Sequence, residues 1–164
     1  MKIHQLHQTQ FLPISPENAW EYFATPKTLE EMTPEFLNFE ILSDPPATLH
    51  SGLLIAYRIR AVAGIPMNWL TEIKHVVPLR RFVDEQRVGP FSFWLHEHTF
   101  TPVDGGIEMT DHVHYVMPWG PIGSLIHPLF VRRRLESIFS FRRAYLEKKF
   151  CFSIPRVCPD NKGL

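Results

Sequence analysis

The chain has 164 residues, of which 45% are hydrophobic and 13% aromatic. That is enough apolar material for one folded core, which excludes wholesale disorder, and the length leaves little room for a second domain. Lysine plus arginine and aspartate plus glutamate both number 17, so the formal net charge is zero. A neutral chain is a poor candidate for wrapping nucleic acid by phosphate neutralisation, and we expect no nucleic-acid partner.

Cysteine positions and hydropathy indicate the compartment. Cys151 and Cys158 both lie near the C-terminus, where a disulfide could not cross-link the body of the fold. The N-terminal segment lacks the apolar core of a signal peptide, and no apolar run is long enough to span a bilayer. We therefore expect a reduced, cytoplasmic protein with no integral membrane segment.

The first third of the chain predicts one strand and two short helices. Residues 1–12 alternate between polar and apolar side chains, which is typical of a strand. The Ser-Pro-Glu segment 15–17 supplies an N-cap, a proline for the first helical turn and an acid that favours the helix dipole. This first helix should end near Thr25, and a second should end near Met32, before the next proline.

The middle of the chain predicts an antiparallel meander, because short apolar runs are separated by turns rich in proline, glycine and aspartate. The expected strands lie near 38–43, 53–62, 67–76, 80–88, 91–101 and 107–117. Helical periodicity then runs from Ile122 to Phe150, with Pro128 marking either a kink or a late helix start. We expect one domain over 1–150 and a flexible tail over 151–164.

This order of elements predicts an α+β helix-grip fold. In it, a long C-terminal helix lies across a curved seven-stranded antiparallel sheet, two short helices follow strand 1, and a cavity remains between sheet and helix. Several segments match a known pattern in the same order: Ser15–Glu17 with Trp20, Thr33-Pro34, Trp69–Ile73, Phe82–Asp84 with Gly89–Phe91, Trp94–Phe100, Asp111–Tyr115, Pro118–Gly120 with Gly123, and Ile138-Phe139 with Arg142-Arg143.

On these segments the chain resembles the Bet v 1/START-like (SRPBCC) superfamily, specifically its bacterial polyketide cyclase/dehydrase and lipid-transport branch, over roughly residues 3–150. The resemblance implies a helix-grip ligand-binding domain. Members of the superfamily bind lipids, quinones, hormones and polyketides, and only a subset catalyse a reaction, so the fold does not settle the function.

The last predicted hairpin carries two histidines on one face of a strand, His96 and His98. A two-residue turn would place Asp111 on that face, whereas a three-residue turn would place His112 and His114 there. We favour the first register. In it Asp111 gains His98 as a hydrogen-bond partner, and the aromatic residues of both strands form one wall.

Three interpretations compete for this polar face. His96, His98 and a carboxylate could bind a metal ion. The His98–Asp111 pair could transfer a proton near neutral pH, as in a cyclase or dehydratase. We favour a third interpretation, a hydrogen-bonded polar floor that orients a mainly apolar ligand, and so expect no metal and no cofactor.

Two neighbouring strands repeat an aromatic residue followed by polar ones. Thr71 follows Trp69 at two-residue spacing, and Asp84 and Gln86 follow Phe82 in the same way. Asp84 and Gln86 either face the cavity or face solvent, and the sequence leaves both possibilities open.

The C-terminal helix carries two kinds of arginine. The run 132–134 spreads around the helix, and we expect Arg133 and Arg134 to reach solvent. Arg142 instead follows the apolar stripe toward the sheet. There it would snorkel, pair with an acid such as Asp84 or Asp111, or meet a ligand carboxylate.

The sequence therefore predicts a monomer or homodimer that binds a hydrophobic or amphipathic small molecule, such as a lipid, an isoprenoid or quinone, or a polycyclic aromatic compound. The alternatives are the cyclase-type enzyme and an interaction module for a partner enzyme, whose cavity would be collapsed. The expected ligand-binding residues are Tyr57, Trp69, Thr71, Phe82, Asp84, Gln86, Trp94, His96, His98, Phe100, Asp111, Tyr115, Ile126, Phe130, Phe139 and Arg142.

Overall fold

The computed structural model describes residues 2–62, 64–118 and 130–151. Their strands form one antiparallel sheet in the order β1-β7-β6-β5-β4-β3-β2. The strands are β1 (His4–Leu12), β2 (Glu40–Ile41), β3 (Leu54–Val62), β4 (Ile65–Val77), β5 (Arg81–Val88), β6 (Phe93–Val103) and β7 (Gly106–Val116). The helices are α1 (Pro16–Phe23), α2 (Thr28–Glu31), the 3-10 turn η1 (Glu35–Leu37), α4 (Arg132–Leu146) and the π-helical turn η3 (Glu147–Cys151).

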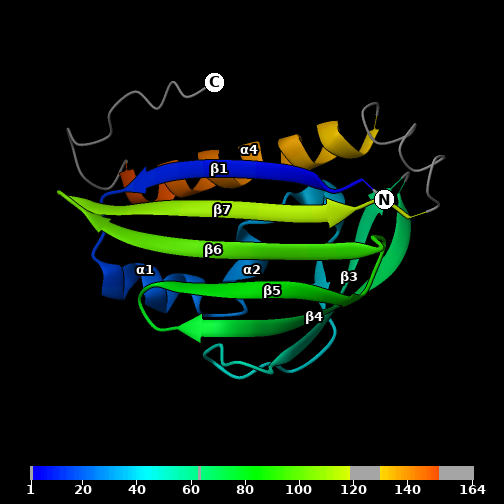
Figure 1. Ribbon diagram of the computed structural model, residues 1–164, viewed down its shortest axis with the longest axis horizontal. Helices are drawn as coiled ribbons and strands as arrows, with labels where there is room; N and C mark the ends of the chain where they lie inside the picture. The colour runs from blue at the N-terminus through cyan, green and yellow to red at the C-terminus, as the bar shows by residue number, and fades with distance from the viewer. Residues whose placement is uncertain (1, 63, 119–129, 152–164) are drawn as a thin grey trace.

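The predicted α+β helix-grip fold is confirmed. In Figure 1, α4 runs along β1 and β7, and the sheet curves away from it toward β3. The helix buries Leu135, Phe139, Arg142 and Leu146 at helical spacing. The earlier part of the predicted helical stretch, with Ile126 and Pro128, lies outside the described residues, as do Cys158 and the rest of the predicted tail after Cys151.

The first helix begins as its sequence predicts. The Ser15 hydroxyl accepts a hydrogen bond from the Asn18 backbone N–H at 3.2 Å, and Pro16 occupies the first helical turn. Its buried residues, Ala19 and Phe23, belong to the core that α1 forms with β6 and β7. This end of the sheet is therefore filled by side chains.

The last hairpin has the favoured register. Val103 pairs with Gly106, so the turn contains only Asp104 and Gly105, and Gly105 has a φ of 80° that favours glycine. As a result His98 lies opposite Asp111 on the concave face of the sheet. The two-residue turn thus determines which polar groups meet.

Gly106 allows the start of β7 to approach the end of β1 closely. A Cβ atom at Gly106 would lie 2.2 Å from the Leu12 carbonyl oxygen and 3.0 Å from the Pro13 Cα. We expect Gly106→Ala to lower the free energy of unfolding by about 1–3 kcal/mol, because backbone would have to move. Urea denaturation measures the loss. A variant as stable as the wild type would contradict the close approach.

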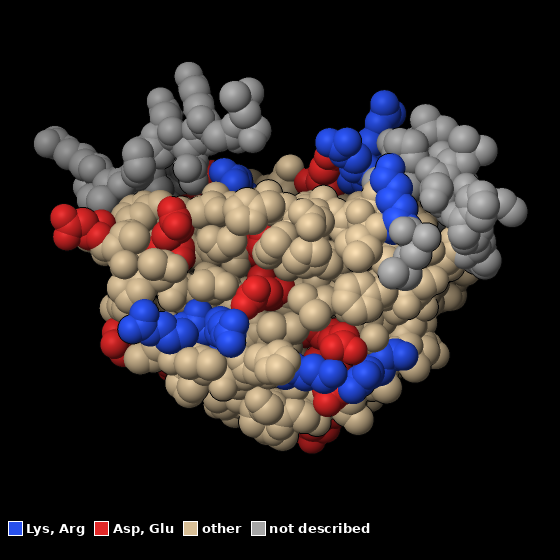
Figure 2. Space-filling model, in the orientation of Figure 1, with Lys and Arg blue, Asp and Glu red and all other residues tan. Residues whose placement is uncertain are grey.

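The outer face of the sheet carries paired charges. Figure 2 shows lysine and arginine side chains lying beside aspartate and glutamate on the face that it presents. The pairs across β4, β5 and β6 include Lys74–Glu85 at 2.9 Å and Arg81–Glu97 at 3.1 Å. Both signs are therefore interleaved on this surface. No helix among the described residues is long and apolar enough to cross a membrane.

Candidate functional site

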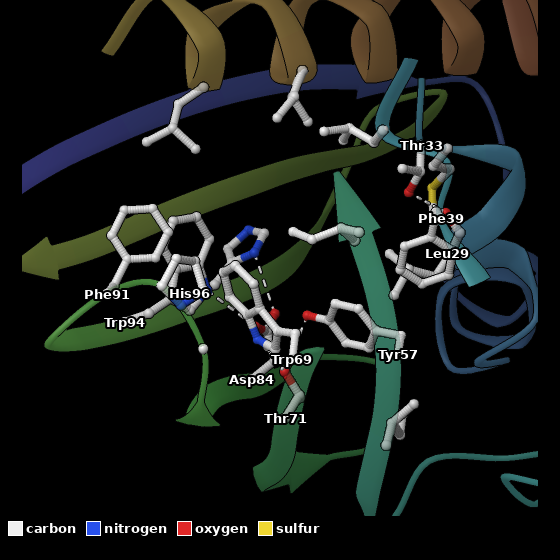
Figure 3. Close-up of a pocket in the computed structure, with 18 of the residues that line it drawn as sticks. Leu29, Thr33, Phe39, Tyr57, Trp69, Thr71, Asp84, Phe91, Trp94 and His96 are labelled. Atoms are coloured by element: carbon white, nitrogen blue, oxygen red, sulfur yellow. Dashed lines mark hydrogen bonds and ion pairs between the residues drawn. The ribbon is translucent and has the colours of Figure 1, made fainter. Parts of the chain in front are cut away.

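A cavity of about 1190 Å³ lies between the concave face of the sheet and α4. Small-molecule pockets usually measure about 300–1,000 Å³, so this one is large. Apolar and aromatic side chains from α2, β3, β4 and α4 make up most of its wall, and polar groups of β5 and β6 form one side (Figure 3). The cavity predicted from the element order is thus present and open.

The aromatic wall is held together by ring contacts and by one hydroxyl. Trp69 stacks on Tyr57, with ring centres 5.8 Å apart, and meets Trp94 edge-on at 5.4 Å. Figure 3 shows Tyr57 and Trp69 converging on Thr71. The Thr71 hydroxyl accepts a hydrogen bond from Trp69 Nε1 at 3.1 Å and lies 3.3 Å from the Tyr57 hydroxyl. The polar atoms of this wall are therefore satisfied, and its faces are left for apolar contact.

Two histidines and two aspartates meet at the polar side of the cavity, and we call Asp84, His96, His98 and Asp111 the His–Asp cluster. His96 Nε2 lies 3.0 Å from Asp111 Oδ1, and His98 Nε2 lies 2.9 Å from Asp84 Oδ2, both with hydrogen-bond geometry. The other two contacts, His96 Nδ1 to Asp84 Oδ2 at 3.2 Å and His98 Nδ1 to Asp111 Oδ1 at 2.9 Å, are close approaches of a ring nitrogen to a carboxylate oxygen. Each histidine thus touches both aspartates.

The hydrogen bond expected between Asp111 and His98 is wrong in detail. His98 Nδ1 approaches Asp111 but has no aligned hydrogen bond among the described residues, whereas His96 makes that bond. His98 instead bonds Asp84 from the neighbouring strand β5. The reason is geometric: His98 and Asp111 are directly opposite, so the diagonal neighbour His96 has the better angle.

Charge shifts the pKa values of Asp84, Asp111 and His96 in this cluster. Burial raises the pKa of the Asp84 carboxyl, but the charge and contacts of His96 and His98 outweigh burial and hold that pKa well below its usual value. Burial also raises the pKa of the Asp111 carboxyl. The Arg142 guanidinium, whose Nη1 lies 3.7 Å away, and the two histidines outweigh burial and hold that pKa well below its usual value. Burial lowers the pKa of His96, but Asp84 and Asp111 raise it above its usual value. The site is therefore built to hold positive charge between two carboxylates.

Two arginines of α4 line the same cavity. Arg142 is 7% exposed and pairs with Asp111, one of the partners that its helical spacing predicts. The guanidinium of Arg134 lies 3.8 Å over the Phe36 ring. The prediction that Arg134 reaches solvent is right only in part, because Arg134 is half-buried and lines the cavity; Arg133 is exposed as expected.

Most predicted site residues lie in the cavity wall, although their role in binding stays a prediction. Those that line it are Tyr57, Trp69, Thr71, Phe82, Asp84, Trp94, His96, His98, Phe130, Phe139 and Arg142. Asp84 therefore faces the cavity, one of the two possibilities that the sequence left open. Proton transfer by His98 and Asp111 likewise stays a prediction.

Four predicted residues lie beside the cavity without lining it. The Gln86 amide donates a hydrogen bond to the Phe91 carbonyl and accepts one from the Phe91 backbone N–H, so it stabilises the turn between β5 and β6. Phe100 and Tyr115 are 1% and 2% exposed and belong to the packed core. Asp111 does not line the cavity but contacts three residues that do, His96, His98 and Arg142. Ile126 lies outside the described residues.

Sequence reasoning missed the cavity residues contributed by the segment after α1. Leu29, Met32, Leu37 and Phe39 all line the cavity, and the Phe39 ring packs against Tyr57 with ring centres 4.9 Å apart. Leu29 and Met32 are three residues apart, so the helical spacing of a short amphipathic helix could have found them.

Residues 12–141 match the family model described as polyketide cyclase/dehydrase and lipid transport. The chain belongs to this family. The Bet v 1/START-like resemblance predicted from the sequence is thereby confirmed. None of the curated proteins matches the chain in sequence.

Solved structures confirm the fold. The protein TTHA0849 from Thermus thermophilus has a TM-score of 0.69 at 18% identity, covering 92% of this chain and 99% of its own. The protein Ms6760 from Mycobacterium smegmatis has a TM-score of 0.62 at 18% identity, covering 91% of this chain and 98% of its own. Ara h 8.0201 has a TM-score of 0.58 at 15% identity, covering 90% and 99%. At these identities the likeness shows a shared fold.

Proposed function

We propose that the protein binds a hydrophobic or amphipathic small molecule in the cavity between the sheet and α4. The observation that carries this proposal is the open cavity of about 1190 Å³ with an aromatic wall. Burying about 200–300 Å² of apolar ligand surface would contribute about 5–7 kcal/mol before ordering costs, which is compatible with micromolar binding. The matched family, whose description names lipid transport and polyketide cyclases, supports this choice.

The arrangement of polar groups supports an amphipathic ligand. Trp69 and Tyr57 offer apolar ring faces to the cavity, and Asp84 and His96 lie beside them (Figure 3), with His98 in the same wall. A ligand with an apolar body and one polar end would satisfy both surfaces. Lipids, isoprenoids or quinones, and polycyclic aromatic compounds with an oxygen substituent share this property.

Native mass spectrometry of the full-length chain, followed by solvent extraction, tests the proposal. We expect an adduct of one small molecule per chain, or, from a stripped preparation, saturable binding of the apolar fluorescent probe N-phenyl-1-naphthylamine. An adduct-free mass together with no saturable probe binding would overturn it.

Filling part of the cavity should weaken binding without unfolding the protein. Ile55 on β3 is 4% exposed and lines the cavity, whereas its neighbour Leu54 is 51% exposed on the opposite face. We expect Ile55→Trp to weaken probe binding about tenfold or more, because the indole occupies ligand space. Leu54→Trp, the matched control, should bind the probe like the wild type. Equal effects of the two variants would show that the probe binds elsewhere.

A further inference from the structure

Three donor atoms of the His–Asp cluster converge at the polar side of the cavity. Asp84, His96 and His98 each offer one ligand atom, and these atoms lie within 4.8 Å of one another; the ring nitrogens nearest Asp84 Oδ2 are His96 Nδ1 and His98 Nε2. Among the described residues, no other group of three or more histidines, cysteines or acids is arranged in this way. We propose that these three residues bind a divalent transition-metal ion of the zinc class, with its remaining coordination positions open to the cavity.

The spacing of the donors fits such an ion. Ligand atoms about 2.0–2.1 Å from a metal lie about 3.0 Å apart at right angles and about 3.3 Å apart in a tetrahedron. Asp84 Oδ2 lies 3.2 Å from His96 Nδ1 and 2.9 Å from His98 Nε2. A shift of a few tenths of an ångström therefore suffices to admit the ion. Two imidazoles and one carboxylate are a donor set that zinc and other first-row metals favour.

Asp111, the fourth member of the cluster, contacts both imidazole rings on the side away from Asp84. His96 Nε2 bonds Asp111, and His98 Nδ1 lies 2.9 Å from the same carboxylate oxygen. This contact directs the opposite nitrogen of each ring, Nδ1 of His96 and Nε2 of His98, toward Asp84. A carboxylate behind a metal-bound histidine fixes the ring orientation and strengthens the ligand. Asp111 is thus a positioning residue for both rings.

Charge also favours a cation at this point. Asp84 and Asp111 are two carboxylates, and Arg142 lies 3.7 Å from Asp111, whereas no lysine or arginine among the described residues pairs with Asp84. A divalent ion bound to Asp84 would supply the positive charge that this carboxylate needs in a largely buried site. The three proposed ligands line the cavity, so an oxygen of a bound molecule could complete the coordination. This inference goes beyond ligand binding and can be tested without any organic ligand.

The test uses the full-length chain, freed of metal with a chelator and titrated with Zn²⁺ and, as a coloured probe, with Co²⁺. We expect about one ion per chain with a micromolar or lower dissociation constant, and a Co²⁺ absorption band that shows nitrogen and oxygen ligands. Asp84→Asn, which keeps the size of the side chain, should weaken binding at least about tenfold. Asp111→Asn should weaken it about 10–100-fold through the two rings.

The outer face provides the matched control. His112 and His114 lie side by side there, with ring centres 4.1 Å apart, and project away from the cavity. The double variant His112→Gln/His114→Gln should bind the metal like the wild type, which distinguishes the cavity site from an adventitious surface pair. Circular dichroism melts verify that each variant is folded. If one variant is not folded, the stoichiometry of the wild type and the affinities of the folded variants still test the proposal.

Binding of much less than one ion per chain by the wild type would overturn the proposal. So would unchanged affinity in a folded Asp84→Asn variant, or loss of binding in the outer-face variant. Probe binding by N-phenyl-1-naphthylamine is measured on the same samples. A protein that binds the probe but no metal would refute the metal site alone, and the reverse result would refute the proposed ligand binding alone.

Discussion

Replacing Phe100 by alanine is expected to remove about 3–5 kcal/mol from the free energy of unfolding. Phe100 is 1% exposed, and its ring centre lies 5.2 Å from that of Phe23 and 6.1 Å from that of Trp20. The space left by the ring would lie behind the cavity wall, among packed core side chains that would lose their contacts with the ring. For a chain of this size, the melting temperature should fall by about 6–20 °C.

Thermal and urea denaturation measure this effect, and the same strand supplies the control. Phe93 lies at the start of β6 and is 39% exposed. Phe93→Ala should therefore change the melting temperature only slightly. Equal losses for the two phenylalanines would show that the packing around Phe100 does not stabilise the protein.

Replacing Arg142 by methionine should destabilise the protein by about 3–5 kcal/mol, because it leaves the buried Asp111 carboxylate without its cation. Asp111 is 3% exposed and Arg142 is 7% exposed, so water cannot screen the remaining charge. Methionine keeps the apolar length of the side chain, and the loss therefore reports on charge rather than on packing.

A double-mutant cycle separates this coupling from other effects. In Arg142→Met/Asp111→Asn both charges are removed, and we expect part of the lost stability to return. Arg133→Met, on the exposed side of the same helix, serves as the control and should change stability by less than about 0.5 kcal/mol. Additive losses in the double variant would show that Arg142 does not stabilise Asp111.

The sequence alone predicts the fold and the hairpin register, because both depend on short-range patterns. The turn of Asp104 and Gly105, together with strict alternation in β6 and β7, is enough to place Asp111 opposite His98. The helix start at Ser15 is equally local. Signals of this kind do not depend on how the elements later pack.

Alternation shows which face a side chain occupies, but not what covers it. Trp94, His96, His98 and Phe100 all lie on the concave face of β6, yet only the first three line the cavity. Phe100 is covered by Trp20 and Phe23, whose positions follow from the way α1 docks. The boundary between core and cavity is therefore a tertiary property that strand periodicity cannot supply.

The contacts within the His–Asp cluster could not be predicted from the sequence either. The sequence favoured no metal, because two histidines at this spacing on a strand are common and no further ligand motif supports them; the carboxylate that meets both, Asp84, comes from a different strand. Its approach to both histidines depends on the register between β5 and β6, which a turn of several residues leaves undetermined. The position of Arg134 in the cavity wall could have been predicted, because its four-residue spacing from Ile138, and that of Ile138 from Arg142, places the three on one face of the helix.

The pairing of β1 with β7 affects how the chain folds. The first strand synthesised pairs with the last, His4 opposite Tyr115, and β1 also receives α4: the Gln10 amide bonds the Arg143 carbonyl at 3.0 Å. Pairing across such a sequence separation slows folding, since a long loop must close first. During synthesis on the ribosome β1 stays unpaired, and its glutamine and histidine side chains keep the segment hydrated until β7 is available. Folding therefore finishes only when the C-terminal helix emerges.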